Sequence, residues 1–419
     1  MFANFEEGGG SAGWECLLQT APRSPSFSSS LLSPKMHLAQ ELVDYVVDFL
    51  HDDPTTLIQL SLVSKAWVGR ARMRLCETLH ITRRKLIFAD LSFLAPLCGH
   101  AKIIHLTWPT DLPNPVAVMD CFEQSKPHTL AIHSCELRSL DEQTIRRYFA
   151  KFPCATITTL AFHAVSPTHR VFLALLSLFP NVDNLLISVN RCWGDRPSPV
   201  RLEDDYNEIV QRTSPPRYTG TFTFSDPPGH GVWGYQRGEL LRTIAVFPLQ
   251  FQAVSLSTKE QSWEDALIFL DSCSKTVRKL FVELASCKYQ TWVFMPHIPG
   301  CSECKFLAPS WVNRPSIDLP NLEELHVGVP WSDVEEPHPL LRSITFPQLR
   351  RMVIETEAAW WLPPDEFLAD LVRKHNTHGD FTLRISTRAD PEYIRGKLPL
   401  VVQQGVLEVC HNARPDYSI

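Results

Sequence analysis

The strongest hydrophobic pattern in the chain lies in residues 36–80 and predicts the first of three short helices there. Apolar side chains recur every four residues, at Leu38, Leu42, Val46 and Leu50. This spacing places a wide apolar stripe along one side of a helix of about three turns. A helix with such a stripe needs a packing partner, either in the same chain or on another protein.

Two further helices are predicted directly after the first. Asp53 suits an N-cap and Pro54 suits the first position of a second helix. Ser64 is placed to cap a third helix, which contains Trp67. Three helices within about 40 residues cannot bury all their apolar surface against one another, because so small a unit is marginally stable alone. We therefore expect the following chain or another protein to cover part of it.

Beyond residue 80, apolar and polar residues alternate with a period of two in short segments, which predicts a series of β-strands with one buried face each. A further strand of this kind is expected at residues 221–224. The other segments begin at Ile104, Leu130, Leu160, Leu185, Val254, Leu280, Leu325, Met352 and Leu383.

Helical apolar patterns lie between these strands, around residues 139–152, 171–179, 263–270 and 367–372, and Ser139 is the expected cap of the first. Strand, loop, helix and loop recurring every 25 to 30 residues, roughly, is typical of leucine-rich-repeat solenoids. We therefore expect an α+β to α/β solenoid. The competing interpretation is a doubly wound α/β domain, which would have longer apolar strands and more glycine in its ligand-binding loops.

These patterns divide the chain into four parts. Residues 1–35 are rich in Gly and Ser and are expected to be disordered. Residues 36–80 form the triple helix, and residues 81–390 form the irregular strand–helix repeats. Residues 391–419 are expected to form a C-terminal cap, with a capping helix, and a tail. Within the repeats, residues 190–218 are rich in Pro and charge and are expected to form a flap over the concave face.

Composition narrows the class of protein. The 419 residues carry a net charge of −6, which argues against a dedicated nucleic-acid surface. Lys65, Arg70, Arg72 and Arg74 are accordingly interpreted as a solvated helix face. No apolar run reaches the length of about 18 residues that a membrane span needs, and no secretion signal is recognisable at the N-terminus. The 12 cysteines lack framework spacing, which fits reduced thiols in the cytoplasm or nucleus.

Candidate sites for metal or enzyme chemistry are few. Cys301-x-x-Cys304 is a lone pair without a second pair at zinc-ribbon spacing, so no metal or other cofactor is expected. His133 and His163 occupy equivalent strand positions, with His105 one step away, and strands about 4.8 Å apart would let these side chains meet. No carboxylate or Cys shares their column, so exposed histidines are favoured over a metal pair. Neither a phosphate-binding loop nor a nucleophile elbow is present, and the chain is not expected to be an enzyme.

Residues 36–80 resemble the F-box, and the spelling HDDPTTL…LVSKAW is similar to F-box proteins abundant in mushroom-forming fungi. One departure is Ala39, where the family usually has Pro. The residues that carry the likeness are Leu38, Glu41, Leu42, Val46, Leu50, Asp53-Pro54, Leu57, Leu60, Val63-Ser64-Lys65 and Trp67.

The resemblance implies the substrate receptor of a Skp–cullin–F-box ubiquitin ligase, which binds a Skp-type adaptor, through it a cullin, and a target protein through the repeats. Such a receptor is not catalytic and acts by proximity. The alternative is a scaffold that binds the adaptor without delivering substrates. The implied adaptor contacts are Leu38, Glu41, Leu42, Val46, Leu50, Leu57, Leu60, Val63 and Trp67. Each of these residues could instead pack in the core of the triple helix. For Leu50 and Trp67, packing in the core and contact with the adaptor are equally favoured.

Tryptophans that follow predicted strands are the candidates for binding the unknown target protein. Trp at the rim of a concave surface is a frequent binding anchor. The alternative is that the rings fill gaps between imperfect repeats. These residues are Trp108, Trp193, Trp331, Trp360 and Trp361.

Overall fold

The structure is a computed structural model, and the segment 1–35 lies outside the residues that it describes. The described residues are 39–50, 53–63, 65–82, 97–107, 114–133, 137, 140–165, 168–189, 199–210, 216–225, 239–259, 263–285, 316–329, 344–356, 362–376 and 379–411.

The N-terminal part folds into the three predicted helices, α2 (Gln40–Phe49), α3 (Pro54–Val63) and α4 (Lys65–Glu77). Asp53 caps α3 as expected, because its carboxylate accepts hydrogen bonds from the backbone N–H of Thr56 at 3.0 Å and from the Thr56 hydroxyl at 2.6 Å. Ser64 lies outside the described residues. Helix α4 passes without a loop into a strand that the sequence pattern did not reveal.

The rest of the chain builds a parallel sheet of 12 strands whose spatial order is the order of the sequence. Every segment predicted from period-two alternation lies in one of these strands, and β1 and β14 were not predicted. The strands are β1 (Thr78–Ile81), β2 (Ile103–Thr107), β3 (Thr129–His133), β4 (Thr159–Val165), β5 (Asn181–Val189), β6 (Arg217–Ser225), β7 (Leu249–Lys259), β8 (Lys279–Ala285), β10 (Glu324–Val329), β12 (Arg351–Thr356), β13 (Thr382–Thr387) and β14 (Leu407–His411). A separate parallel pair is formed by β9 (Ile317–Asp318) and β11 (Ile344–Thr345).

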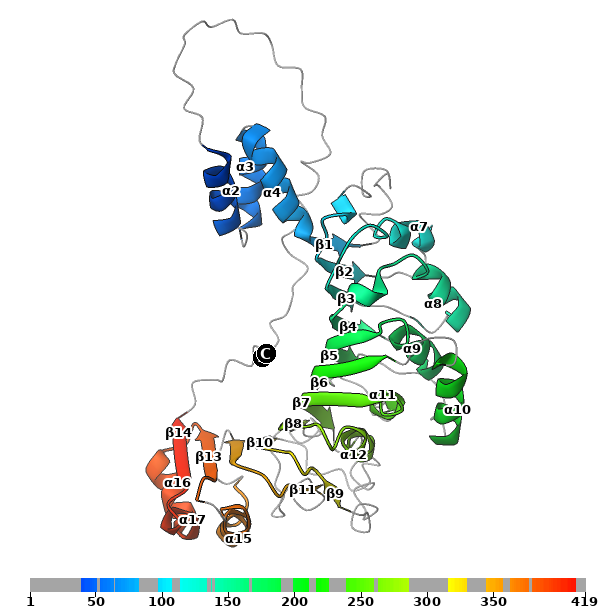
Figure 1. Cartoon of the computed structure of the whole chain (residues 1–419). Helices are drawn as coiled ribbons and strands as arrows, with labels where there is room; N and C mark the ends of the chain where they lie inside the picture. The colour runs from blue at the N-terminus through cyan, green and yellow to red at the C-terminus, as the bar shows by residue number, and fades with distance from the viewer. Residues whose placement is uncertain are drawn as a thin grey trace, which may run out of the picture.

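The sheet is curved, and helices α7 to α12 lie along its convex side (Figure 1). A doubly wound domain reverses its strand order and carries helices on both faces. The sequential strand order excludes that interpretation for the described strands. The helices after the triple helix are α7 (Pro115–Asp120), α8 (Glu142–Tyr148), α9 (His169–Leu176), α10 (Pro199–Val210), α11 (Glu239–Ile244), α12 (Trp263–Ser272), α15 (Asp365–His375), α16 (Pro391–Lys397) and α17 (Pro399–Gln403).

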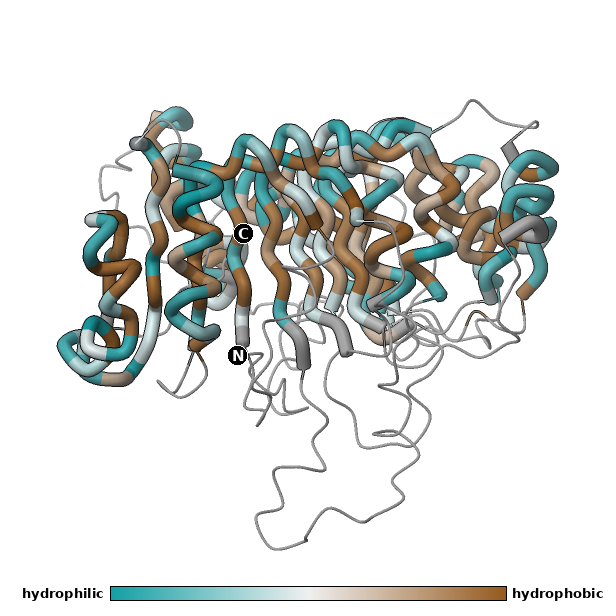
Figure 2. The backbone as a smooth tube through the Cα atoms, turned by 90° about the horizontal axis from the view of Figure 1, so that it is seen from below, coloured by the Kyte–Doolittle hydropathy of each residue, from teal (hydrophilic) through white to brown (hydrophobic). Residues whose placement is uncertain are grey.

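The core lies between the sheet and the convex helices, because alternate residues of each strand point to that side. In β4, for example, Leu160 and Phe162 are fully buried while His163 on the other face is not. The tube in Figure 2 shows this alternation of hydropathy along the strands. Aromatic rings fill the centre of the core, where Phe222 lies 4.4 Å from the ring of Phe269.

Successive strand–helix units are joined by a repeated backbone contact at the start of each strand. The carbonyl of His128 accepts hydrogen bonds from the backbone N–H groups of residues 158 and 159, and the carbonyl of Arg278 does the same for residues 323 and 324, all within 3.0 Å. Thr156 and Thr276 each stand three residues before a strand, β4 and β8 respectively, and their hydroxyls donate to the carbonyls of Pro127 and Phe251 of the preceding unit. These equivalent contacts satisfy backbone groups that would otherwise be orphaned at the edge of the units.

Two of the expectations for local structure are wrong. Asp141, and not Ser139, caps α8, since its side chain accepts from the backbone N–H of Thr144 at 2.7 Å. Residues 190–218 contain helix α10, which packs against α9 in the convex layer, so this helix is not part of a flap over the concave face. Its buried Leu202 and Ile209 lie on one side of the helix, and Pro199 stands at the first position, where proline is tolerated.

The C-terminal part also departs from the expected capping helix. Two short helices, α16 and α17, are followed by Gly405 with a φ of 73°, a conformation that glycine adopts freely. Leu407 then begins β14, which pairs with β13 and extends the sheet. No helix in the described part of the chain is long and apolar enough to cross a membrane.

Candidate functional site

The triple helix closes a small core of its own. Val47, Leu57 and Ala71 are fully buried in it, with Leu50, Leu60, Trp67 and Leu75 packed around them and half-buried. Leu57, which is 1% exposed, therefore belongs to the interior and has to be removed from the set of expected adaptor contacts. The half-buried Leu50, Leu60 and Trp67 serve mainly to hold the three helices together.

The opposite side of α2 leaves large apolar side chains in solvent. Leu42, Tyr45, Val46 and Phe49 are 56%, 71%, 37% and 78% exposed, and we call these four residues the α2 apolar face. Their spacing of three and four residues puts them on one side of the helix. Contiguous exposed apolar surface of this kind marks interaction sites in soluble proteins.

The expected contact residues therefore divide by burial. Leu42, Val46 and Glu41 on α2 are exposed, and so is Val63 at the end of α3. Leu38 lies outside the described residues. Sequence reasoning missed three exposed apolar residues, which are Tyr45, Phe49 and Leu62.

The signal for the missed pair on α2 was present in the sequence. Tyr45 and Phe49 each follow an expected contact, Leu42 or Val46, by three residues, which is the spacing of neighbours on a helix surface. A step of four residues drifts by about 40° around a helix. Leu50 has consequently turned toward the core, while Leu42 faces solvent.

Ion pairs fix α2 against α4 and set the orientation of the α2 apolar face. The carboxylate of Asp48 accepts from Arg70 Nε at 2.8 Å and from Arg74 Nε at 2.8 Å. The hydrogen bond from Arg70, and to a smaller extent the one from Arg74, hold the pKa of Asp48 well below its usual range. Arg70 and Arg74 are thus structural partners of Asp48, which corrects their interpretation as a freely solvated face.

The same network reaches the start of the sheet. Glu77 at the end of α4 accepts from Arg74 at 2.9 Å and from Lys102, just before β2, at 2.7 Å. Burial alone would raise the pKa of Glu77, but the hydrogen bonds from Lys102 and Arg74 outweigh it and the pKa is lowered. Charged groups therefore connect the triple helix to the first strands.

A column of imidazole rings lies on the concave face of β1 to β4. His80 stacks on His105 with ring centroids 4.4 Å apart, and His133 stacks on His163 at 4.6 Å. The two pairs meet where His105 Nδ1 and His133 Nε2 lie 3.0 Å apart, a hydrogen bond whose donor depends on the tautomers. We call these four residues the histidine ladder. The predicted meeting of His133 with His163 is confirmed, and His80 was missed because β1 was not predicted.

Half-burial keeps most of the ladder in the neutral form. Burial lowers the pKa of His105 and of His163, and burial followed by the neighbouring imidazoles lowers the pKa of His133 to about 4. The three rings are therefore not the freely exposed histidines that the sequence suggested. Among the described residues, no group of three or more His, Cys, Asp or Glu side chains is arranged to hold a metal ion.

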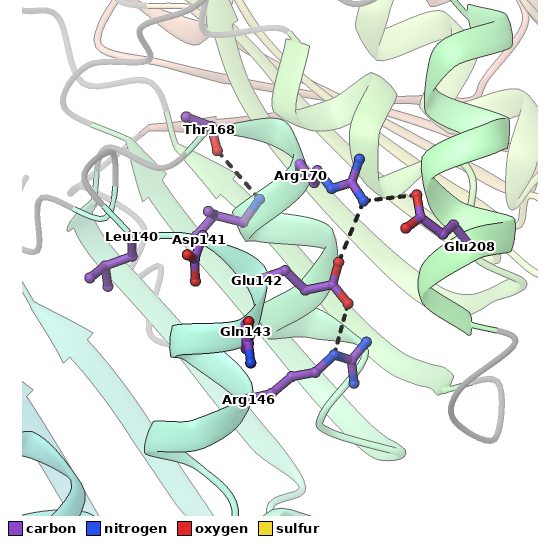
Figure 3. Close-up of a pocket in the computed structure, with 9 residues that line it drawn as sticks. Leu140, Asp141, Glu142, Gln143, Arg146, Thr168, Arg170 and Glu208 are labelled. Carbon is purple, nitrogen blue, oxygen red and sulfur yellow. Dashed lines mark hydrogen bonds and ion pairs between the residues drawn. The ribbon is translucent and has the colours of Figure 1, made fainter.

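A cleft of ≈ 720 Å³ lies on the convex side, where Glu142 and Arg146 of α8 face Arg170 of α9 and Glu208 of α10 (Figure 3). Arg170 pairs with Glu208 at 2.8 Å, and Arg146 pairs with Glu142 at 2.9 Å. These ion pairs help to tie neighbouring helices together, and the acidic side chains of the lining (Asp141, Glu142 and Glu208) outnumber its arginines.

The other residues singled out in the sequence cannot be placed. Cys301 and Cys304 lie outside the described residues, and so do all the candidate tryptophans of the rim, Trp108, Trp193, Trp331, Trp360 and Trp361.

No protein-family model and no curated protein matches this sequence. Function must therefore be argued from the two surfaces described above, the α2 apolar face and the concave face of the sheet with its histidine ladder.

Proposed function

We propose that this chain is the substrate-receptor subunit of a Skp–cullin–F-box ubiquitin ligase and acts in the cytoplasm or nucleus. Its triple helix would be an F-box that binds a Skp-type adaptor. Its strands and convex helices would be an irregular leucine-rich-repeat-like solenoid that presents a target protein. The observation that carries the proposal is the α2 apolar face, which remains open on a helical unit whose own core is already closed.

The energetics of the α2 apolar face favour a protein partner. Fully burying one exposed large apolar side chain contributes about 1.5–3 kcal/mol, and the exposed parts of Leu42, Tyr45, Val46 and Phe49 together offer roughly twice that. Part of this gain is lost to the entropy of association, which is why a contiguous face is needed and scattered apolar residues do not suffice. The exposed Leu62 and Val63 at the end of α3 add further apolar surface to the same unit.

The sheet supports the second half of the proposal. Its strands follow one another in sequence order, and the units share equivalent backbone contacts at their strand starts. This arrangement supports a solenoid-like organisation, in which successive units stack and the concave face would be available for binding. The direct passage from α4 into β1 and the ion pair from Glu77 to Lys102 would fix the F-box relative to that face.

The proposed receptor performs no bond-making step itself. A target on the concave face and a ubiquitin-conjugating enzyme on the cullin would be held in one assembly, so that transfer becomes effectively intramolecular. The residues that matter for activity would then be contact residues, and substitutions should act through binding.

Affinity purification of the tagged full chain from cells under proteasome inhibition tests the proposal. Wild type should retain a Skp-type adaptor, a cullin and ubiquitinated partner proteins. The double variant Leu42→Asp/Val46→Asp should lose all of them, because two charges would enter the apolar interface. The matched control is Tyr393→Asp/Val402→Asp, which changes two exposed apolar residues near the other end of the sheet and should behave as wild type.

Two outcomes would contradict the proposal. If wild type retains no Skp-type adaptor, the F-box assignment is wrong. If it retains the adaptor but no ubiquitinated protein, the chain is an interaction scaffold that does not deliver substrates.

A further inference from the structure

The histidine ladder occupies a part of the concave face that has an unusual composition. We call the strand residues that point to the concave face, away from the core, the inward positions. In β1 to β4 the described inward positions carry imidazole, hydroxyl and aliphatic side chains, and none of them carries Asp, Glu, Lys or Arg. The inward residues are Thr78, His80, Ile103, His105, Thr107, Thr129, Ala131, His133, Thr159, Ala161 and His163.

The other end of the concave face is charged. Glu324 on β10 pairs with Lys279 at 3.3 Å and with Arg351 at 3.2 Å. Two rows further along the same face, Glu283 and Glu355 flank Gly328 in register. Burial, followed by the charge of Glu283, raises the pKa of Glu355, and Arg384 on the neighbouring strand β13 offsets part of this rise. This end of the concave face therefore carries charges of both signs, whereas the ladder end carries no fixed charge.

We propose that the histidine ladder is a docking surface for an acidic segment, rich in Asp and Glu, of the target protein. This inference rests on the proposed function, since it names the kind of target that the receptor would present. The ladder places imidazole rings of four neighbouring strands in one strip, and an imidazole can donate or accept a hydrogen bond. Threonine hydroxyls on the same strands add further donors.

The chemistry of the strip distinguishes between ligands. A basic segment would need carboxylates, and the inward positions of β1 to β4 have none. Phosphorylated segments are usually recognised by Arg clusters, and these positions have no Arg or Lys. Carboxylates suit imidazoles that can both donate a hydrogen bond and accept a proton. An acidic segment is therefore the ligand that the strip fits best.

Binding of carboxylates should be linked to protons. A carboxylate close to an imidazole raises its pKa, so rings that are neutral in the free chain become charged in the complex. Other charged groups near the ladder lie at the starts of the strands, where Glu77 pairs with Lys102, and the nearby His128 contacts Thr129. Strand β5 contributes the inward residues Asn184 and Ser188, which do not titrate. Affinity should therefore rise as the pH falls, about tenfold per pH unit for each proton taken up.

Fluorescence anisotropy with the full chain tests the inference. The probe is a fluorescein-labelled peptide of eight glutamates, compared with glutamine and lysine peptides of equal length. The glutamate peptide should bind best, and its affinity should be higher at pH 6.5 than at pH 7.5. The variant His105→Gln/His133→Gln should bind it at least about tenfold more weakly and with a smaller pH dependence, because His80 and His163 remain, while His128→Gln, outside the ladder, should match wild type.

The inference is overturned if the glutamine or lysine peptide binds as well as the glutamate peptide, or if the affinity is the same at both pH values. It is also overturned if His128→Gln loses as much affinity as the ladder variant. Imidazole NMR signals of wild type give a readout that needs no variant: the pKa values of His105, His133 or His163 should rise on adding the glutamate peptide. Adaptor binding, measured on the same samples, separates the two proposals, because failure of the ladder leaves adaptor binding intact and failure of the F-box assignment abolishes it.

Discussion

Asp48 of α2 accepts a pair of hydrogen bonds from Arg70 of α4, at 2.8 Å from Nε and at 2.6 Å from Nη2. This two-point contact matches the flat guanidinium to the flat carboxylate and fixes the rotation of α2 about its axis. Val43 and Val47 consequently face the core, while Leu42 and Phe49 face solvent. The orientation of the surface that would bind the adaptor thus depends on a polar contact on the other side of the helix.

Replacing Asp48 with Asn should destabilise the triple helix by about 1 kcal/mol, because the partly exposed arginines lose their charged acceptor. Adaptor affinity should fall modestly, since the α2 apolar face would be less well oriented. The lowered pKa of Asp48 means that its contribution is present above about pH 4 and is lost as the pH falls below that value. Urea unfolding of wild type and Asp48→Asn at pH 7 and pH 3 measures both effects. An equal difference in stability at the two pH values would contradict this account.

The histidine ladder should make the fold less stable in mild acid. In the folded chain the pKa of His133 is lowered to about 4, whereas an unfolded histidine titrates near 6.5. Between these values the unfolded chain binds more protons, so stability falls as the pH falls from about 6.5 toward 4. His375, packed against Phe346 and with its pKa also lowered to about 4, acts in the same direction.

On going from pH 7.5 to pH 5, the variant His133→Gln should therefore lose about 1 kcal/mol less of its free energy of unfolding than wild type does. Thermal or urea unfolding at the two pH values measures the change, with His128→Gln as the control outside the ladder. Some pH dependence should remain in the variant because His375 is unchanged. If His133→Gln and wild type lose stability in parallel, the ladder is not the source of the acid sensitivity.

Gly220 makes a close contact within the sheet that only glycine allows. It has a φ of 70° at the irregularity where the pairing of β5 and β6 shifts register, and a Cβ there would collide with the backbone carbonyl of Asp183. Gly220→Ala should destabilise the chain by at least about 2 kcal/mol, because the strained conformation and the collision add up. Gly379→Ala is the matched control, since Gly379 also has a positive φ but has open space around it. Chemical denaturation of both variants should show the larger loss for Gly220; equal losses would mean that the collision is relieved.

Much of the sheet could be predicted from the sequence because each strand buries one face. Period-two alternation marks such strands directly, and segments such as those around Leu160 and Met352 lie where expected. Strand β1 was not predicted because it continues α4 without a turn, and His80 was therefore not recognised as a strand residue. Helix α10 was not predicted because it lies in the segment 190–218, which is rich in Pro and charged residues. Its buried residues Leu202 and Ile209 nevertheless follow the helical period.

The candidate site was less predictable, because burial in a small helical unit depends on the angles between its helices. The sequence identifies Leu42, Leu57 and Val63 as apolar positions of the motif, but Leu57 turns inward and the other two outward. Spacing alone cannot separate these cases when apolar residues surround much of a helix. The contact of His105 with His133 likewise depends on side-chain directions across two strands, and strand register alone does not give them.

The most direct test of the central claim is the affinity of the purified full chain for a purified Skp-family adaptor from the same organism, measured by isothermal titration calorimetry. Wild type and the control Tyr393→Asp/Val402→Asp should bind equally, and Leu42→Asp/Val46→Asp should bind at least about a hundredfold more weakly, because each charge in the interface costs 1.4 kcal/mol or more, roughly one factor of ten. Circular dichroism should show that all three proteins are folded. Absence of binding by folded wild type, or equal binding by the α2 variant, would contradict the account.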